Sequence, residues 1–415
     1  MQLPKAGRPR DEILADLAQL REGDVDWRSG RTFSYVFSGG EDVHDIAREA
    51  ASMYLSENAL NPMAFPSLGQ MQADVVDMMS DLLNGGVEAA GFMTSGGTES
   101  ILCAVKAARE RGREERGIDR PQMVLADSAH AAFHKAAHYF GVEVAKIPVR
   151  DDWRADVDAM AAAVTDRTVL VVGSAPQYPQ GVVDPIPELA ATAADAGANF
   201  HTDACMGGLV LPFMEAVGHE VPPWDFRVPG VTSISADLHK LGYTPKGASV
   251  IVHRTDALRK YQIFVFDQWL GGFYASSGMM GTKPGAPIAA AWAVLNYLGE
   301  DGYVQRTEQT IATARTIMAG VRALPDLALR GEPDAHVLSF GAAEPEQLDV
   351  FAVGDALQEH KWFLDRQTPP DSLHATVSAG NAPMVDDFLT DLQAAVAQVG
   401  ARQVDDRSTN YATLE

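Results

Sequence analysis

The sequence has few cysteines, few basic residues and no long apolar run. Cys103 and Cys205 are the only cysteines among 415 residues. Two cysteines are too few for a disulfide framework and form no paired metal-binding motif, so we expect a reducing compartment, the cytoplasm. No stretch of about 18 uncharged apolar residues occurs, and residues 1–17 lack the apolar core of a signal peptide. These absences predict a protein with neither a membrane span nor a secretory signal.

The shortage of basic residues leaves a strongly acidic chain. Lys and Arg number 33 against 56 Asp and Glu, which gives a formal net charge of -23. Nucleic acids and anionic membranes are therefore poor partners, because binding them requires clustered Lys and Arg. The same charge would repel a phosphorylated ligand, so any site for one must be locally basic. The chain is too long for one hydrophobic core, so we expect a large domain and at least one smaller one.

The middle of the chain has the pattern of an α/β domain. Helical patterns alternate with short apolar runs, which predicts a mainly parallel sheet covered by helices on both faces. In such sheets, ligands bind beyond the carboxyl ends of the strands. The apolar runs begin near residues 122, 168, 198, 231 and 248.

We divide the chain into four parts. The first carries two helical patterns and predicts an arm that is too small to form its own core. The third shows a strand, a helix, a strand and a helix, which predicts a small C-terminal α+β domain. The parts are the N-terminal helical arm 1–60, the large α/β domain 61–300, the small domain 301–402 and a polar tail 403–415.

A pair of glycines precedes a helical pattern in "TSGGTESILCAVKAA". The free N–H groups at a helix N-terminus attract phosphate, and Gly96 and Gly97 would let the backbone approach it closely. Thr98 could add its hydroxyl. By itself the pattern is more typical of an ordinary capped loop.

Two further residues follow apolar runs that we predict to be strands. Asp203, in "NFHTDACMGG", could bond the pyridine nitrogen of pyridoxal 5'-phosphate (PLP), although a helix-capping Asp is the alternative. Lys240 lies in a loop after a later run. A lysine shielded from water can lose its proton and form a Schiff base, whereas most lysines are solvated surface charges.

Three histidines recur every four residues in "AHAAFHKAAHYF". This spacing suggests a metal site, but no carboxylate or thiolate completes the set, and ligands spread over two helical turns do not converge readily on one ion. We therefore expect no metal. His130 could instead stack on a planar cofactor, while His134 and His138 are expected at the surface.

The order of these features along the chain is that of the fold-type I PLP enzymes. The segments "TSGGTESI", "AHAAFHKAA", "HTDACMGG", "DFRVPGVTSISADLHKLGYTPKG" and "GGFYASSGMMGTKPG" resemble, in that order, signatures of the sphingosine-1-phosphate lyases. The similarity covers about residues 50–310 and continues less clearly into the C-terminal part. It implies a fold-type I PLP-dependent transferase-like fold.

The resemblance implies roles for the residues above. Lys240 would hold PLP covalently, Asp203 would pair with the pyridine nitrogen and His130 would stack on the ring. The site would lie between two subunits of a homodimer. The cofactor phosphate would be held by Gly96, Gly97, Thr98 and His239.

The resemblance also implies residues that handle the substrate. Thr282 and Lys283 of "GTKPG" would approach from the partner subunit, and Lys246 and Tyr274 match positions associated with the substrate, so either could be the catalytic base. Asn61, in "NALNP", stands where relatives often have His. Because Asn cannot become a cation, recognition of the substrate phosphate departs from the family pattern here.

The activity implied is retro-aldol cleavage of a phosphorylated long-chain base, similar to sphingosine 1-phosphate, into a fatty aldehyde and ethanolamine phosphate. The alternative is an amino-acid decarboxylase, because group II decarboxylases share the H-x-D-A and H-K elements. An Arg placed to bind a substrate carboxylate would favour it, and the sequence offers no clear one. A third reading is a non-catalytic PLP-binding protein, against which the joint presence of Lys240, Asp203 and His130 argues.

Overall fold

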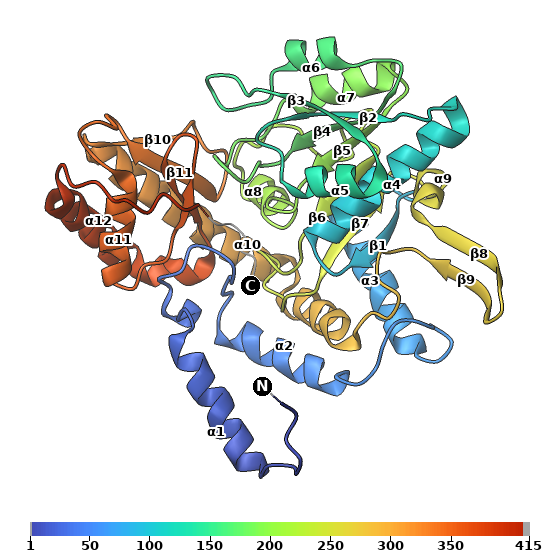
Figure 1. Cartoon of the computed structure of the whole chain (residues 1–415), viewed down its shortest axis with the longest axis horizontal. Helices are drawn as coiled ribbons and strands as arrows, with labels where there is room; N and C mark the ends of the chain where they lie inside the picture. The colour runs from blue at the N-terminus through green and yellow to red at the C-terminus, as the bar shows by residue number, and fades with distance from the viewer. Residues whose placement is uncertain (1, 410–415) are drawn as a thin grey trace.

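The computed structural model describes residues 2–409 and places a seven-stranded sheet at the centre of the large domain (Figure 1). The strand order is β3-β2-β4-β5-β6-β7-β1, and β7 alone runs antiparallel to its neighbours. The mainly parallel sheet expected from the sequence is therefore present. Its strands are β1 (Ala90–Thr94), β2 (Gln122–Ala126), β3 (Glu143–Ile147), β4 (Thr168–Ser174), β5 (Asn199–Asp203), β6 (Ser233–Ala236) and β7 (Ser249–His253).

Helices cover both faces of this sheet because its strands are apolar on both sides. In β2, Met123 and Leu125 pack into one apolar cluster with residues of α4 and α5, while Val124 and Ala126 pack into another on the opposite face. The helices of the large domain are α3 (Pro66–Leu82), α4 (Gly97–Arg116), α5 (Ala132–Phe140), α6 (Val157–Ala163), α7 (Ile186–Asp195), α8 (Leu211–Ala216) and α9 (Asp256–Arg259).

The small domain is built on a four-stranded antiparallel sheet with the order β10-β11-β13-β12. It has its own apolar core, which Phe33 from the N-terminal segment completes by packing on Trp362 and Phe388. The predicted α/β fold with a small C-terminal α+β domain is confirmed. Its elements are β10 (Leu327–Leu329), β11 (Val337–Ala342), α11 (Val350–Glu359), β12 (Asp365–Gln367), β13 (Ser372–Thr376) and α12 (Val385–Val399).

The element α10 (Gly285–Ala323), two helical segments that meet at a kink, runs from the large domain to the small one (Figure 1). Gly299 leaves the helical conformation within it, with φ 54° and ψ -173°, a region that glycine tolerates best. The division that we predicted at residue 300 falls beside this glycine. The domain boundaries themselves stay predictions.

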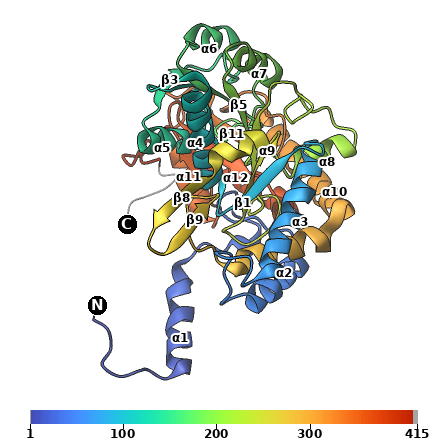
Figure 2. The same ribbon diagram turned by 90° about the vertical axis from the view of Figure 1, so that its right-hand side faces the viewer.

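Two segments project from the body of the chain (Figures 1 and 2). The helix α1 (Arg10–Leu20) buries none of its residues, whereas α2 (Glu41–Met53) packs along α10. The hairpin β8 (Phe264–Trp269) and β9 (Gly272–Ser276) exposes several large apolar side chains, among them Phe273 and Leu270 at its turn. No described helix is long and apolar enough to cross a membrane.

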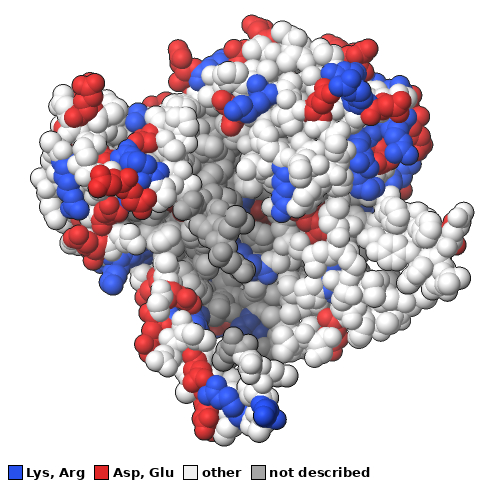
Figure 3. Space-filling view, in the orientation of Figure 1, with Lys and Arg blue, Asp and Glu red and all other residues white. Residues whose placement is uncertain are grey.

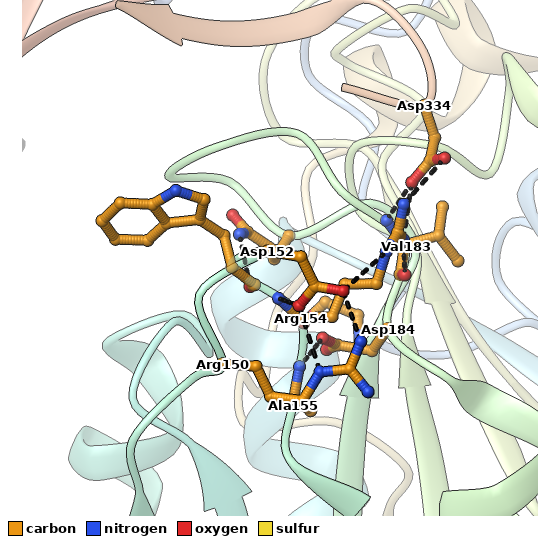
Figure 4. A network of polar contacts seen from close by, with 10 residues as sticks. Arg150, Asp152, Arg154, Ala155, Val183, Asp184 and Asp334 are labelled. Atoms are coloured by element: carbon orange, nitrogen blue, oxygen red, sulfur yellow. Dashed lines mark hydrogen bonds and ion pairs between the residues drawn. The ribbon is translucent and has the colours of Figure 1, made fainter. Parts of the chain in front are cut away.

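Polar contacts fasten the two domains together (Figure 4). Arg154 of the large domain donates two hydrogen bonds to Asp334 of the small one, at 2.8 and 3.1 Å, and a third to the carbonyl of Val183. Asp334 also accepts from the Val183 backbone N–H at 2.6 Å. Beside them, buried Asp184 accepts from the backbone N–H of Ser174, at the end of β4. This network thus connects the small domain to a strand end that borders the site described next.

Candidate active site

A cavity of about 270 Å³ lies beyond the carboxyl ends of the parallel strands. This is where the α/β pattern predicts a ligand. Basic side chains are visible in the hollow between the two domains (Figure 3). The cavity is lined by Ser95, Gly96, Gly97, Thr98, Glu99 and Ile101 after β1, His130 after β2, Ser174, Pro176, Gln177 and Tyr178 after β4, Asp203, Cys205 and Met206 after β5, and Asp237, His239 and Lys240 after β6.

The N-terminus of α4 forms one wall of the cavity. No side chain caps this helix, so its first N–H groups and the positive end of its dipole are directed at the cavity. A Cβ atom at Gly97 would lie 2.8 Å from Cys205 Sγ and 2.9 Å from Asp237 Oδ2, and one at Gly96 would lie 3.2 Å from His239 Cε1. Larger residues would fill the cradle, so the space and the N–H groups fit a phosphate group.

Lys240 forms an ion pair that the sequence analysis missed. Its Nζ atom lies 2.9 Å from Oδ2 of Asp237, which is buried. Burial alone would raise the pKa of Asp237, but the charges of Lys240 and His239 hold it at about 2. The signal was available, because Asp237 directly follows the strand β6, three residues before Lys240. The carboxylate keeps the lysine amine at the cavity wall.

The two other predicted cofactor contacts also reach the cavity. His130 accepts a hydrogen bond from the backbone N–H of Ala132 at 3.1 Å, and burial lowers its pKa although Asp203 raises it. Asp203 is the last residue of β5, and its Oδ1 atom accepts from the Cys205 backbone N–H at 3.1 Å. A neutral imidazole and a carboxylate therefore face the same cavity. His134 is exposed, as predicted.

Two lysines predicted at the site lie outside the cavity wall of this chain. Lys246 is an exposed residue whose amine donates to the carbonyl of His239 at 2.9 Å. Partial desolvation of the amine, together with the charge of Lys240, lowers its pKa to about 8. Lys283 is buried and donates to the Met93 carbonyl at 2.8 Å and to the side chain of a glutamine. Burial lowers the pKa of Lys283 to about 8. Its ammonium group is thus directed into its own chain.

The remaining predicted residues are also away from this cavity. Tyr274, on β9, contacts the rings of Phe264 and Trp269 in the projecting hairpin. Asn61 lies in an exposed turn, where its Oδ1 atom accepts a hydrogen bond from the Met63 backbone N–H. Thr282 is exposed in the loop before α10. None of these three side chains lines the cavity of this chain. Their roles stay predictions.

A second hollow of about 530 Å³ adjoins the cavity and shares His130 and Tyr178 with it. Tyr178 stacks on His374 with 4.0 Å between the ring centroids, and its hydroxyl donates to Asp365 at 2.6 Å. Sequence reasoning missed Tyr178, which lies in the loop after β4. The rule that ligands bind beyond strand ends would have found it.

Comparisons with known proteins identify the family. Residues 1–342 match the pyridoxal-dependent decarboxylase conserved domain. The chain is 39% identical to a sphingosine-1-phosphate lyase of Arabidopsis thaliana over 94% of this chain and 72% of the relative. It is 40% identical to sphingosine-1-phosphate lyase 1 of Rattus norvegicus over 96% of this chain and 70% of the relative.

A solved structure of a Burkholderia pseudomallei sphingosine-1-phosphate lyase superimposes with a TM-score of 0.91 at 39% identity, covering 96% of this chain and 92% of that one. The resemblance inferred from the motifs is therefore confirmed, and with it the cofactor, PLP. The uncapped helix start, the cradle at Gly96 and Gly97 and the lysine at the cavity wall fit that group. The chain belongs to the sphingosine-1-phosphate lyase family and is a PLP-dependent lyase.

Proposed function

We propose that this enzyme cleaves a phosphorylated long-chain base, similar to sphingosine 1-phosphate, between C2 and C3. The products would be a fatty aldehyde and ethanolamine phosphate. One observation carries the proposal: in a chain of this family, a single cavity brings together the phosphate cradle, His130, Asp203 and Lys240. These are the parts that such a cleavage requires.

The residues around the cavity have distinct roles in holding the cofactor. Asp203 would pair with the pyridine nitrogen, His130 would lie against the ring and Lys240 would form the covalent link. When bound, PLP accepts the electron pair of a bond that breaks next to the substrate nitrogen. The phosphate would be bound by the helix start and its neighbours, Gly96, Gly97, Thr98 and His239.

The cleavage also requires a base that takes the proton from the C3 hydroxyl of the substrate. A general base works best when its pKa lies near the working pH. Lys246, with a pKa of about 8, meets this condition and is close enough to Lys240 for the charge of Lys240 to lower that pKa. Tyr274 is the other candidate, and it would have to reach the site from the hairpin of a partner subunit. We retain both.

Recognition of the substrate phosphate must overcome the net charge of -23. We propose Lys283 and Tyr274 for this purpose, and Lys246 where Tyr274 is the base, since only a protonated lysine pairs with phosphate. Asn61 lies in the turn where relatives often have His. Lys283 would need to give up its contact with the Met93 carbonyl to take part, so Lys246 is the stronger of the two lysines.

We further propose a cytoplasmic homodimer with shared sites, in which Thr282 approaches the cavity of the partner subunit. The exposed position of Thr282 and the apolar side chains on the β8–β9 hairpin support this arrangement, because a lone chain would leave that apolar surface in water. Neither nucleic acid nor an integral membrane association enters the proposal.

Product analysis distinguishes this activity from the alternatives. Purified protein would be incubated with PLP and, separately, a phosphorylated long-chain base, its dephosphorylated analogue and a panel of amino acids, and the products identified by mass spectrometry. We expect aldehyde from the phosphorylated base and none from the Lys240→Ala variant. Carbon dioxide from an amino acid would instead support a decarboxylase, and no product at all would support a non-catalytic PLP-binding protein.

A further inference from the structure

Behind Asp203 lie two buried polar side chains that the proposed mechanism does not use. His201 precedes Asp203 by two residues on β5, so the two side chains emerge on the same face of the sheet. Ser235 is the cross-strand partner of Asp203 on β6, and Ser233 is the partner of His201. His201 and Ser235 have no exposed surface. Strand register therefore assembles one polar row beneath the cavity.

Hydrogen bonds connect this row to the carboxylate. The Ser235 hydroxyl donates to Asp203 Oδ1 at 3.2 Å. His201 Nε2 lies 3.1 Å from Ser235 Oγ, and His201 Nδ1 lies 2.9 Å from Ser233 Oγ. The Ser235 hydroxyl has only one proton, and Asp203, as a carboxylate, can only accept. The proton of Ser235 therefore points to Asp203, and Ser235 Oγ accepts from His201 Nε2 and, at 3.3 Å, from the Cys205 thiol.

One tautomer of His201 satisfies all of these contacts. Burial lowers the pKa of His201 to about 4, although Asp203 raises it, so the imidazole is neutral and carries a single N–H. That proton must be on Nε2 in order to donate to Ser235, which leaves Nδ1 to accept from Ser233. Every donor in the row then points toward Asp203. Such a chain of hydrogen bonds strengthens each of its members.

We propose that His201, acting through Ser235, is a positioning residue that fixes Asp203 for its contact with the pyridine nitrogen of PLP. Oδ1 of Asp203 is held by Ser235 and by the Cys205 backbone N–H, which leaves Oδ2 for the cofactor. Because His201 is neutral, it orients the carboxylate without adding a positive charge that would compete with the protonated ring. The inference rests on the proposed role of Asp203 as the partner of the ring nitrogen.

The proposal predicts a specific change in the cofactor. In Ser235→Ala, Asp203 loses a hydrogen bond and His201 loses its acceptor, so the carboxylate is free to rotate away from the ring. A hydrogen bond to a charged group is worth roughly ten- to a hundredfold in an equilibrium. We therefore expect kcat to fall about ten- to a hundredfold with little change in KM. We also expect the ring nitrogen to lose its proton in a larger fraction of molecules.

The test uses full-length protein loaded with PLP labelled with 15N in the ring. The 15N chemical shift of the ring nitrogen reports its protonation without any turnover. We expect the unmodified enzyme to show a protonated nitrogen, and Ser235→Ala and His201→Leu to move the shift toward the unprotonated value. Ser235→Thr keeps the hydroxyl and His201→Gln keeps a donor near the position of Nε2, so both should restore the shift. Ser233→Ala, which touches only the far ring nitrogen, is the matched control and should change it least.

The outcomes separate this inference from the proposed function. An unchanged 15N shift in both Ser235→Ala and His201→Leu, with PLP still bound, overturns the positioning role and leaves the lyase activity standing. A ring nitrogen that is unprotonated in the unmodified enzyme instead overturns the proposed role of Asp203 itself. If Ser235→Ala does not fold, the His201→Leu and His201→Gln pair decides the matter, because failure of Gln to restore the shift also refutes the inference.

Discussion

The carboxylate of Asp365 joins three parts of the chain, and its loss should be costly. Asp365, the first residue of β12 in the small domain, accepts hydrogen bonds from Ser34 at 2.8 Å, from Tyr35 at 2.8 Å and from Tyr178 at 2.6 Å. The first two donors belong to the N-terminal segment and the third lines both hollows of the large domain. We predict that Asp365→Ala both destabilises the fold and loosens the cofactor cavity.

The expected loss follows from these contacts. A hydrogen bond to a charged acceptor is worth about 1.5 to 3 kcal/mol, and such bonds to one group do not add fully. Asp365 and Ser34 are buried, whereas Tyr35 is 41% exposed, so the bond from Tyr35 is discounted for solvent. We expect Asp365→Ala to lower the free energy of unfolding by about 3 to 5 kcal/mol. Tyr178→Phe, which removes one of the bonds and keeps the ring, should lower it by about 1.5 to 3 kcal/mol.

Urea denaturation of the cofactor-free protein measures these losses, and titration with PLP measures the effect on the cavity. Asp387→Ala is the matched control, because Asp387 pairs with Arg31 at the surface, where ion pairs are worth about 0 to 1 kcal/mol. Asp365→Ala should also weaken PLP binding more than Asp387→Ala does, since Tyr178 loses its anchor. Equal losses of stability for Asp365→Ala and Asp387→Ala would refute the reasoning.

Three further changes test other parts of the account. Asp334→Ala removes the acceptor of the Arg154 bonds between the domains and should cost about 2 to 4 kcal/mol in urea denaturation, against less than about 1 kcal/mol for the more exposed Asp152→Ala. Similar costs for the two variants would contradict the role of this network. Lys246 is charged below its pKa of about 8 and neutral above it, so KM for the phosphorylated base should rise as the pH passes 8. Lys246→Arg should abolish this rise, because arginine stays charged. The same rise with the dephosphorylated analogue would exclude phosphate binding by this lysine. Mixing inactive Lys240→Ala with an inactive Thr282 variant should restore part of the activity through hybrid sites, whereas a fully active monomer at high dilution would disprove shared sites.

Much of the fold was predictable because buried strands and amphipathic helices leave strong patterns. The strand β4 is buried along its whole length and its sequence is an apolar run between helical patterns. The hairpin β8–β9 was missed because its apolar residues, such as Phe264, face solvent in the single chain and show no alternation with polar ones. The strand β12 was missed because it has only three residues, Asp365–Gln367.

The site was predictable to the extent that its residues follow strands. Asp203 and Lys240 could be placed together, because the carboxyl ends of parallel strands meet at one edge of the sheet. The contact between Tyr178 and Asp365 joins residues that are 187 positions apart, so no local sequence pattern predicts it. The burial of Lys283 was equally hidden, since a motif gives the position of a residue but tertiary packing decides where its side chain points.

Reductive trapping of the cofactor tests the central claim most directly, namely that Lys240 carries PLP in the cavity beyond the strand ends. The purified protein would be loaded with PLP, reduced with borohydride, digested and mapped by mass spectrometry. The account predicts a pyridoxyl group on the peptide that contains Lys240 and none in the Lys240→Ala variant. A pyridoxyl group on Lys246 instead, or full labelling of the Lys240→Ala variant, would contradict it.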